Sequence, residues 1–468
     1  MGSDELLQEV RAFCRDAHLA ESTFGRLAVN DGKLMSRLRA GSGITSETLQ
    51  RLRTFMAEHR AARGGAVVGG AVPPPQEQIG RSSMAVAAQQ TQEIEPEREF
   101  RFFDNRQKYL LFVNTCAEKQ VVASRVSQEL DNIHPQPPAV RVFDAGVGDG
   151  TVLTRVMRSM HTRFPTMPFY IVGKEISLED VRLALEKMPD RFYEHPETVL
   201  ILTNMYYAEA PWLTARDPVA AHNMVWHEVA LRGDSSHEFE EQISDLQPFL
   251  DANWTAHSSP KTGNPVYDRP VVLVVYRDDR RFVLDATLPK RGNLRADYDL
   301  VIASQPYRAR ASTAFKAKRV VAPLARAIGP GGRLIGIHSW GHDPGLEIIQ
   351  KVWPGENPFV TDRHALLKEV KQELGGAGRD LTFKANSDAK SVFRYHMHAM
   401  PGEVSGAIGT STLFAAWNAA VYVAQVEDER LSEAQKGDAY IKATDEVLKK
   451  YGGLWFNDES YVISRRRD

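Results

Sequence analysis

Apolar residues in the first part of the chain recur at the three- and four-residue spacing of helices. The first stripe consists of Leu6, Leu7, Val10 and Phe13. Similar patterns follow, separated by a turn and by a glycine-containing stop. They predict four short helices, over about residues 3–13, 22–29, 33–40 and 45–55, and hence a small all-α module in residues 1–62.

The pattern is lost at about residue 63. Residues 63–76 are rich in glycine and proline, and a polar stretch follows from residue 87. Such a composition buries too little apolar surface to offset the entropy of ordering the chain. It predicts a flexible linker over residues 63–98.

Helical and strand patterns then alternate along the larger remainder, residues 99–468. A helical stretch over about 100–130 precedes alternating patterns between Val140 and His338, which predict βαβ units and a mostly parallel sheet with helices on both faces. The fold class is therefore α/β. A final strand is expected over 453–464.

A long insert, at about residues 206–296, interrupts this alternation. It exceeds a usual connection between elements. We expect a hairpin within it, formed by residues 271–276 and 281–284. A substrate lid above the sheet and structural padding both remain open as interpretations.

Composition narrows the class of protein. The chain has 468 residues, which favours two or more domains, and a formal charge of −2, which argues against a globally basic nucleic-acid binder. Its two cysteines have no metal-ligand spacing, and His396 and His398 lack a third partner, so no metal site is predicted. The sequence shows neither a signal peptide nor a run of roughly 18 apolar residues, so we expect a cytoplasmic protein without a membrane span.

A glycine-rich turn follows the first predicted strand of the sheet. The strand ends at Asp144 and is followed by Gly146, Gly148 and Gly150, which open an amphipathic helix. Glycines at such a turn let the backbone approach a nucleotide-like ligand. Glu175 ends the next strand, where a carboxylate can accept hydrogen bonds from ribose hydroxyls. The alternative is a turn kept for tight packing beside a surface glutamate.

The segment Asp144-Ala-Gly-Val-Gly-Asp-Gly150 resembles the first motif of class I S-adenosylmethionine-dependent methyltransferases. The resemblance covers roughly residues 140–338 and implies a Rossmann-like sheet with S-adenosylmethionine as cofactor. It implies that Gly146 and Gly148 line the methionine part of the cofactor and that Glu175 holds its ribose. Asn204, after the third strand, takes the place of an acidic residue that contacts the adenine amine. The predicted cofactor-binding residues are therefore Asp144, Gly146, Gly148, Gly150, Glu175 and Asn204.

The fourth strand ends in Ser304-Gln-Pro-Tyr307. In family members that methylate exocyclic amines, a polar residue stands here before Pro-Pro-Tyr or Pro-Pro-Phe; its side chain and a carbonyl accept the amine hydrogens, and the ring stacks on the target. Gln305 replaces the first proline, which weakens the case for a base amine as acceptor. His338 ends the fifth strand, where it serves either as a general base or as a structural histidine. The predicted catalytic residues are Ser304, Tyr307 and His338; a loop without a catalytic part is the alternative.

The N-terminal module resembles helix-turn-helix domains of the phage-repressor type. Residues 22–29 would be the supporting helix and residues 33–39 the recognition helix. The resemblance implies contacts to DNA phosphates and base edges from Lys33, Ser36, Arg37 and Arg39. A helical module that binds protein, or that forms a homodimer, is the competing interpretation.

These observations predict an S-adenosylmethionine-dependent methyltransferase that acts on a nitrogen or oxygen nucleophile. The insert, the missing proline and the neutral charge favour a small-molecule acceptor. One alternative is a nucleic-acid amine methyltransferase guided by the helix-turn-helix module. Another is a DNA-binding regulator whose catalytically inactive methyltransferase fold senses the cofactor.

Overall fold

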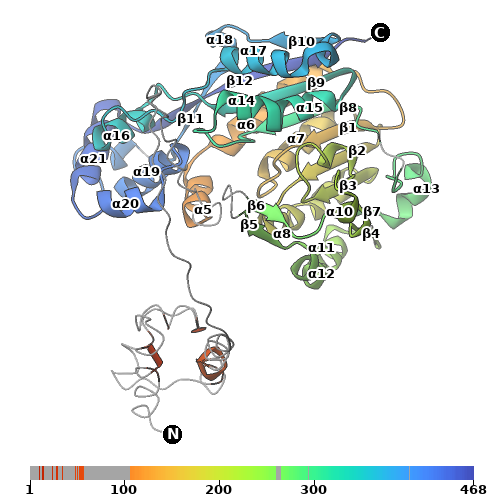
Figure 1. Cartoon of the computed structure of the whole chain (residues 1–468), viewed down its shortest axis with the longest axis horizontal. Helices are drawn as coiled ribbons and strands as arrows, with labels where there is room; N and C mark the ends of the chain where they lie inside the picture. The colour runs from red at the N-terminus through yellow and green to blue at the C-terminus, as the bar shows by residue number, and fades with distance from the viewer. Residues whose placement is uncertain are drawn as a thin grey trace, which may run out of the picture. The chain divides into compact units, whose positions relative to one another are not determined.

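The structure is a computed structural model, and the chain divides into two compact units, residues 1–94 and 95–468 (Figure 1). In the C-terminal unit it describes residues 106–259, 265–292, 295–399 and 401–467. In the N-terminal unit it describes residues 10, 13–14, 24, 28–29, 34, 48, 50 and 52–56.

The described residues of the N-terminal unit are helical and share a small apolar core. Its buried members include Val10, Phe13, Phe24, Leu34 and Leu52. The rings of Phe13 and Phe24 lie 5.5 Å apart. The linker at 63–98 and the predicted DNA contacts, which are Lys33, Ser36, Arg37 and Arg39, lie outside the described residues. The helix-turn-helix assignment therefore stays a prediction.

A large mixed sheet organises the C-terminal unit. Its strands run in the order β10-β12-β9-β8-β1-β2-β3-β7-β4, and β11 pairs with β12. Their bounds are β1 Val140–Asp144, β2 Phe169–Lys174, β3 Thr198–Thr203, β4 Val225–Leu231, β7 Val271–Arg277, β8 Tyr298–Ser304, β9 Ile328–Ser339, β10 Leu381–Lys384, β11 Val392–His396 and β12 Trp455–Arg465. A separate pair is formed by β5 Ala256–Ser258 and β6 Pro265–Tyr267.

The centre of the sheet is parallel, as the alternating pattern predicted. Strands β3, β2, β1, β8 and β9 all run in one direction. Strand β12 lies between β9 and β10 and is antiparallel to both. The final segment of the chain thus supplies a reversed strand inside this end of the sheet, where β10 is the edge, and the Rossmann-like α/β class is confirmed.

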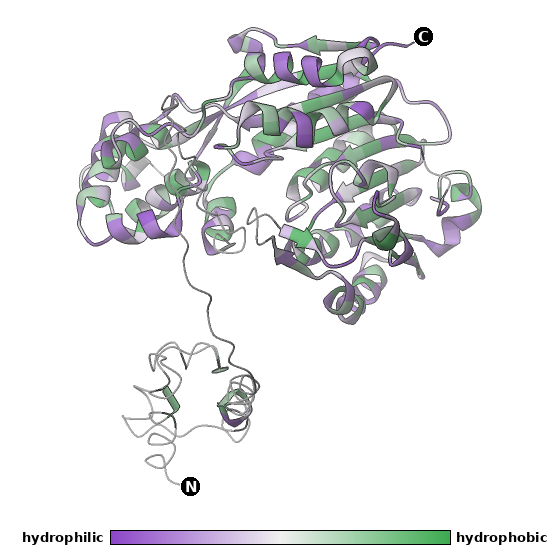
Figure 2. Ribbon diagram, in the orientation of Figure 1, coloured by the Kyte–Doolittle hydropathy of each residue, from purple (hydrophilic) through white to green (hydrophobic). Residues whose placement is uncertain are grey.

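Helices cover both faces of the sheet, and side chains alternate between them. Along β1, Val142 enters the core on one face, and Phe143 enters the core on the other. The first face is covered by α6 Glu118–Ser127, α7 Thr151–Arg163 and α8 Leu178–Glu186; the second by α15 Ala322–Arg326 and α17 Arg363–Leu374. Figure 2 shows largely hydrophobic strands beneath helices with one hydrophobic and one hydrophilic side.

A third core joins the start of this unit to its end. It contains Phe112 of α5 (Arg106–Thr115) together with Trp417 and Tyr422 of α19 (Thr410–Val423). The rings of Phe112 and Tyr422 lie 4.7 Å apart. The same group includes α16 Pro344–Val352, α20 Asp428–Ala434 and α21 Ala439–Tyr451. Smaller helices are α9 Pro189–Glu194, α10 Pro218–His222, α11 Ser236–Ser244, α12 Gln247–Asn253, α13 Arg281–Leu284, α14 Thr313–Phe315 and α18 Asp388–Ser391, with a π-helical turn at Lys316–Val321.

The insert extends the sheet, and the hairpin predicted within it is wrong. Strand β7 pairs antiparallel with β3 and parallel with β4, while residues 281–284 form the short helix α13. All seven residues of β7 are buried, so this strand gains more by pairing between β3 and β4 than by pairing with the next segment. Phe282 of α13 is 96% exposed, which is incompatible with an inner hairpin strand. No helix of the described residues is long and apolar enough to cross a membrane.

Candidate functional site

The predicted glycine turn lies where the parallel strands end. Gly148 and Gly150 adopt φ values of +53° and +78°, which favour glycine. A Cβ on Gly150 would lie 2.8 Å from Cα of Ala184 in α8, so this glycine allows close helix packing. A Cβ on Gly146 would have only the carbonyl oxygen of Ser304 within 4 Å, at 4.0 Å. The structure thus brings Gly146 and Ser304, predicted from separate motifs, to one place.

Glu175 is hydrogen-bonded to the glycine turn. Its buried carboxylate accepts hydrogen bonds from the backbone N–H groups of Gly148 (2.9 Å), Ile176 (2.7 Å) and Ser177 (2.9 Å). Trp254 from the insert donates its indole N–H to the Glu175 carbonyl at 3.1 Å. The alternative of a surface glutamate is therefore wrong.

Asp144 supports the same turn from the end of β1. It is buried, and its Oδ1 accepts the N–H of Gly146 at 3.1 Å. Burial raises the pKa of this carboxyl to about 6, although the bond from Gly146 and the charge of Lys119 oppose the rise. The acid thus fixes the first glycine in place.

A tyrosine that the sequence motifs did not indicate covers the glycine turn. The hydroxyl of Tyr109 in α5 lies 3.4 Å from Oδ1 of Asp149, and a Cβ on Gly148 would lie 3.2 Å from it. Asp149 also accepts bonds from Thr151 (2.5 Å) and Lys187 (2.8 Å). The cover therefore comes from α5, which packs on α19. Its only sequence signal was its place in the helical stretch expected over about 100–130.

The side chain of Asn204 is hydrogen-bonded within the protein. Its side-chain N–H donates to the Arg269 carbonyl at 2.9 Å, and its Oδ1 accepts the N–H of Val271 at 2.8 Å. The amide is buried and joins the end of β3 to the start of β7. Its contact with adenine stays a prediction.

The loop after β8 differs from the Pro-Pro-Tyr and Pro-Pro-Phe motifs in its backbone conformation as well as in its sequence. Gln305 has a φ of +47°, and its N–H donates to the Ile337 carbonyl at 2.9 Å. Proline can supply neither feature. The Gln305 side chain donates to Oγ of Ser339 (3.2 Å) and to Oδ1 of Asp458 (3.3 Å), which ties the loop to β9 and β12.

Tyr307, whose ring was expected to stack on an acceptor, is buried in the protein, and its contact with an acceptor stays a prediction. Only 9% of the residue is exposed, and it belongs to the core of the second sheet face. Its hydroxyl lies 2.7 Å from Nδ1 of His338 and 3.4 Å from the hydroxyl of Tyr461. Burial holds the pKa of Tyr307 well above its usual value, so it stays a neutral phenol.

His338, predicted as either a general base or a structural histidine, is buried and hydrogen-bonded at both ring nitrogens. It is 4% exposed, and its Nε2 lies 2.7 Å from Oε1 of Glu459. Glu459 in turn accepts from the backbone N–H and Nη1 of Arg363, both at 2.7 Å. Both ring nitrogens of His338 are therefore engaged by protein groups in this arrangement. The catalytic role predicted for His338 stays a prediction.

Glu459 keeps its charge despite its burial. Burial alone would raise its pKa, but hydrogen bonds from His338 and Arg363 outweigh this effect and lower it. Sequence reasoning missed Glu459 and its neighbour Asp458. Two adjacent carboxylates within an expected strand were the available signal, because such groups are buried only with partners or a purpose.

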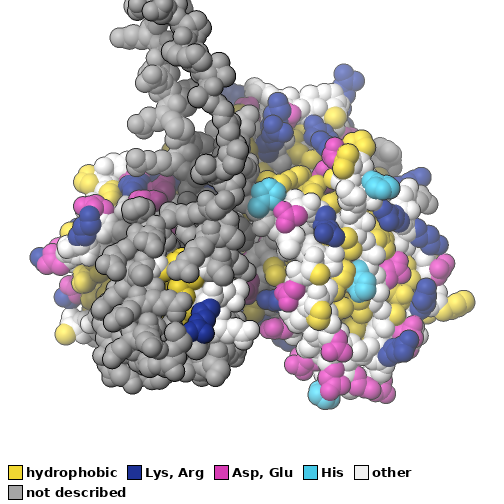
Figure 3. All heavy atoms as spheres, turned by 60° about the horizontal axis from the view of Figure 1, so that its bottom comes forward, with side chains coloured by type: hydrophobic (Ala, Val, Ile, Leu, Met, Phe, Trp, Pro, Cys, Tyr) yellow, Lys and Arg dark blue, Asp and Glu magenta, His cyan; other side chains and the backbone are white. Residues whose placement is uncertain are grey.

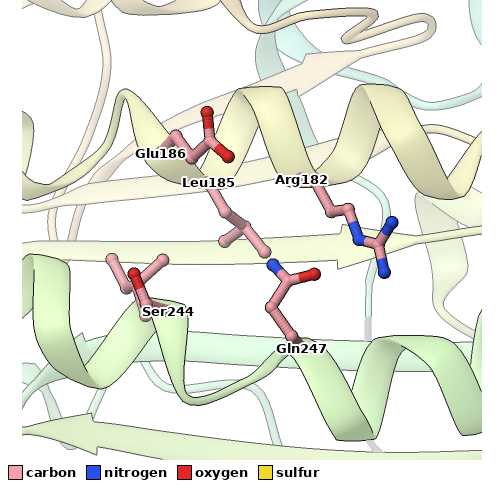
Figure 4. Close-up of a pocket in the computed structure, with 6 residues that line it drawn as sticks. Arg182, Leu185, Glu186, Ser244 and Gln247 are labelled. Carbon is pink, nitrogen blue, oxygen red and sulfur yellow. The ribbon is translucent and has the colours of Figure 1, made fainter. Parts of the chain in front are cut away.

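A pocket of about 400 Å³ lies elsewhere, between α8 and the α11–α12 segment. Its lining residues are Arg182, Leu185, Glu186, Ile243, Ser244 and Gln247. Figure 4 shows Arg182 and Leu185 of α8 extending toward the segment that carries Gln247, with Glu186 turned away from it. None of the lining residues belongs to the glycine turn or to a strand end. Within the described ranges, no group of three or more His, Cys, Asp or Glu side chains is arranged to hold a metal ion.

No protein-family model and no curated protein matches the chain. Solved structures do align with it. One is described as a sarcosine dimethylglycine methyltransferase from Galdieria sulphuraria, with 9% identity over 75% of this chain and 85% of that one, and a TM-score of 0.30. Another is the cyclopropane synthase MmaA2 from Mycobacterium tuberculosis, with 11% identity over 78% and 96% and a TM-score of 0.28. A geranyl diphosphate methyltransferase aligns with 12% identity over 73% and 77% and a TM-score of 0.25. The Rossmann-like α/β class of this chain follows from its own strand order.

Proposed function

We propose that the chain is an S-adenosylmethionine-dependent methyltransferase that acts on a nitrogen or oxygen atom of a small molecule. One observation carries the proposal: Gly146 of the glycine turn and the carbonyl of Ser304 lie next to each other at the ends of the adjacent parallel strands β1 and β8. A Cβ atom placed on Gly146 would lie 4.0 Å from the Ser304 carbonyl oxygen. Ligands of open parallel sheets bind at this edge.

The residues at the carboxyl ends of the parallel strands are suited to binding S-adenosylmethionine. The space beside Gly146 is open apart from Ser304, as a close approach of ligand to backbone requires. Gly146 and Gly148 would line the methionine part, with Asp144 and Gly150 holding the turn. The Glu175 carboxylate, directly beside the Gly148 N–H, would hold the ribose, and Asn204 would lie toward the adenine. S-Adenosylmethionine, when bound, supplies an activated methyl group on a positively charged sulfur.

The protein's own contribution is to position the acceptor. The Ser304 side chain and carbonyl would accept hydrogen atoms of the nucleophile beside Gly146, which turns its lone pair toward the methyl group. Tyr307, His338 and Glu459 would hold the loop that carries Ser304 through their buried hydrogen bonds. Such alignment is the main source of acceleration when the methyl donor is already activated.

Two features favour a small molecule over a nucleic-acid base. The positive φ of Gln305 and the burial of Tyr307 remove the rigid proline loop and the open ring that would hold a flipped base. On the face shown in Figure 3, acidic and basic side chains are interspersed over the visible described surface, and the basic ones do not gather into a stripe.

Calorimetric titration with S-adenosylmethionine and S-adenosylhomocysteine tests the proposal. We expect binding by the full-length protein and at least a tenfold weaker affinity in Glu175→Ala, about 1.4 kcal/mol. The matched control is Glu240→Ala, at an exposed position of α11, which should bind like the unaltered protein. Absence of binding by the unaltered protein would refute the proposal. Binding without methyl transfer to any acceptor, small molecule or nucleic acid, would instead favour a cofactor-sensing regulator.

A further inference from the structure

The cavity of about 400 Å³ between α8 and the α11–α12 segment combines apolar and polar lining residues. Leu185 and Ile243 are buried and form its apolar part. Arg182, Ser244 and Gln247 supply its polar groups, as Figure 4 shows. Cavities of this size and mixed lining are typical of sites for small organic molecules.

The polar side chains of the cavity have unused hydrogen-bonding capacity. Arg182 donates from Nη2 to Asp251 of α12, and its other nitrogens have no hydrogen-bond partner among the described residues. The side chains of Ser244 and Gln247 likewise form no hydrogen bond within the part of the chain that the structure describes. These hydroxyl, amide and guanidinium groups are therefore available to a ligand.

The charges beside the cavity indicate an uncharged ligand. Asp251 offsets the positive charge of Arg182, and Figure 4 shows the Glu186 side chain turned away from the facing segment. A charged ligand would therefore lose its hydration without meeting an unpaired opposite charge. A carboxamide carries no net charge, and its carbonyl and amino groups complement the Gln247 amide, the Ser244 hydroxyl and the guanidinium N–H groups.

Both walls of the cavity are tied to Glu175. Helix α8 begins directly after Ser177, whose backbone N–H donates to the Glu175 carboxylate at 2.9 Å. Trp254 directly follows α12, and its indole N–H donates to the Glu175 carbonyl at 3.1 Å. The ion pair of Arg182 with Asp251 joins the two helices. A ligand between α8 and the α11–α12 segment therefore braces the two segments that hold Glu175.

We propose that this cavity is a regulatory site for a small uncharged carboxamide, and that its occupation strengthens cofactor binding through Glu175. The binding of the amide does not depend on the proposed function, whereas its effect on the cofactor rests on it. Because the coupling of two binding sites is reciprocal, the cofactor strengthens amide binding by the same factor.

Matched amides and acids test the site. The full-length protein is titrated calorimetrically with butanamide and benzamide, and with sodium butanoate and sodium benzoate. We expect saturable binding of at least one amide and at least tenfold weaker binding of its acid, about 1.4 kcal/mol. Ser244→Trp, at an exposed position of the lining, should block the cavity and abolish amide binding with an unchanged melting temperature. Glu240→Trp, exposed on the same helix but outside the lining, is the matched control.

The coupling is measured by titrating S-adenosylhomocysteine with and without saturating amide. We expect an affinity about fivefold higher with the amide, and no such change in Ser244→Trp.

The outcomes separate this inference from the proposed function. If neither amide binds, or if Ser244→Trp binds the amide as tightly as Glu240→Trp does, the site is refuted. Tighter binding of the acids than of the amides would refute the ligand class. Amide binding that leaves the affinity for S-adenosylhomocysteine unchanged would refute the coupling through Glu175. If the amides bind but S-adenosylhomocysteine does not, the proposed function is refuted while the cavity stands as a ligand site.

Discussion

The Tyr307 hydroxyl lies 2.7 Å from Nδ1 of His338, inside the protein and beneath the loop that carries Ser304. The opposite nitrogen of His338 lies 2.7 Å from Glu459, so Nε2–H donates to the acid and Nδ1 accepts from the tyrosine. Glu459 is held by Arg363. The chain of bonds fixes one tautomer of the histidine and one position of the loop, which is a precondition for precise alignment of an acceptor.

Glu459→Gln should destabilise the protein by about 3–5 kcal/mol, because it leaves Arg363 without its buried partner. Urea denaturation of the C-terminal unit, followed by tryptophan fluorescence, measures the change. Asp388→Asn removes a 69% exposed partner of the same arginine and should cost less than about 1 kcal/mol. Equal losses in the two variants would contradict a special role for the buried bond.

Gln305→Pro should also be destabilising, because proline cannot adopt a φ of +47° and has no N–H for Ile337. We expect a loss of about 3 kcal/mol or more. Gln305→Gly provides the contrast: the backbone strain is relieved while the side-chain bonds to Ser339 and Asp458 are lost. If the proline variant were as stable as the unaltered protein, the loop would not have the geometry described above.

The sequence predicted the sheet more successfully than the site. Strands β1, β2, β8 and β9 were predictable because each is an apolar run bounded by turn residues, and the turn at Gly146 follows directly from its spacing. The orientation of Tyr307 was not predictable, because its partner His338 is distant in sequence and meets it only through strand pairing. The predicted hairpin failed for a related reason: β7 pairs with β3, a long-range contact that local alternation does not reveal.

Gly150→Ala tests the close approach of the glycine turn to α8. The new Cβ would lie 2.8 Å from Cα of Ala184, and a φ of +78° is itself unfavourable for alanine. Gly355→Ala is a matched control, because that glycine has a φ of +83° but no atom within 4 Å of the new Cβ. We expect about 1–2 kcal/mol of destabilisation in the control, from backbone strain, and roughly 1–3 kcal/mol more in Gly150→Ala. Indistinguishable melting temperatures would show that α8 does not constrain the turn.

His195 should make the stability of the C-terminal unit fall in mild acid. Its ring stacks on Phe169 at 3.6 Å, Nε2 lies 3.0 Å from the Met167 carbonyl, and Nδ1 lies 3.0 Å from Nδ1 of His161. Burial lowers the pKa of His195 to about 4; the charge of His161 lowers it further, while the bond to Met167 opposes the shift. Between the unfolded value of about 6.5 and this folded value, the unfolded chain binds the extra proton, so stability is complete above pH 6.5 and is lost as the pH falls toward 4.

The measurement for His195 is a difference between two proteins. Urea denaturation of the unaltered chain and of His195→Gln at pH 7.0, 5.5 and 4.5 cancels the contributions of carboxyl groups that titrate in the same range. The advantage of histidine over glutamine should shrink by of order 1–3 kcal/mol between the highest and lowest pH. An advantage that stays constant, or that grows in acid, would mean that the folded protein accommodates the imidazolium and that the stacking on Phe169 does not exclude the charge.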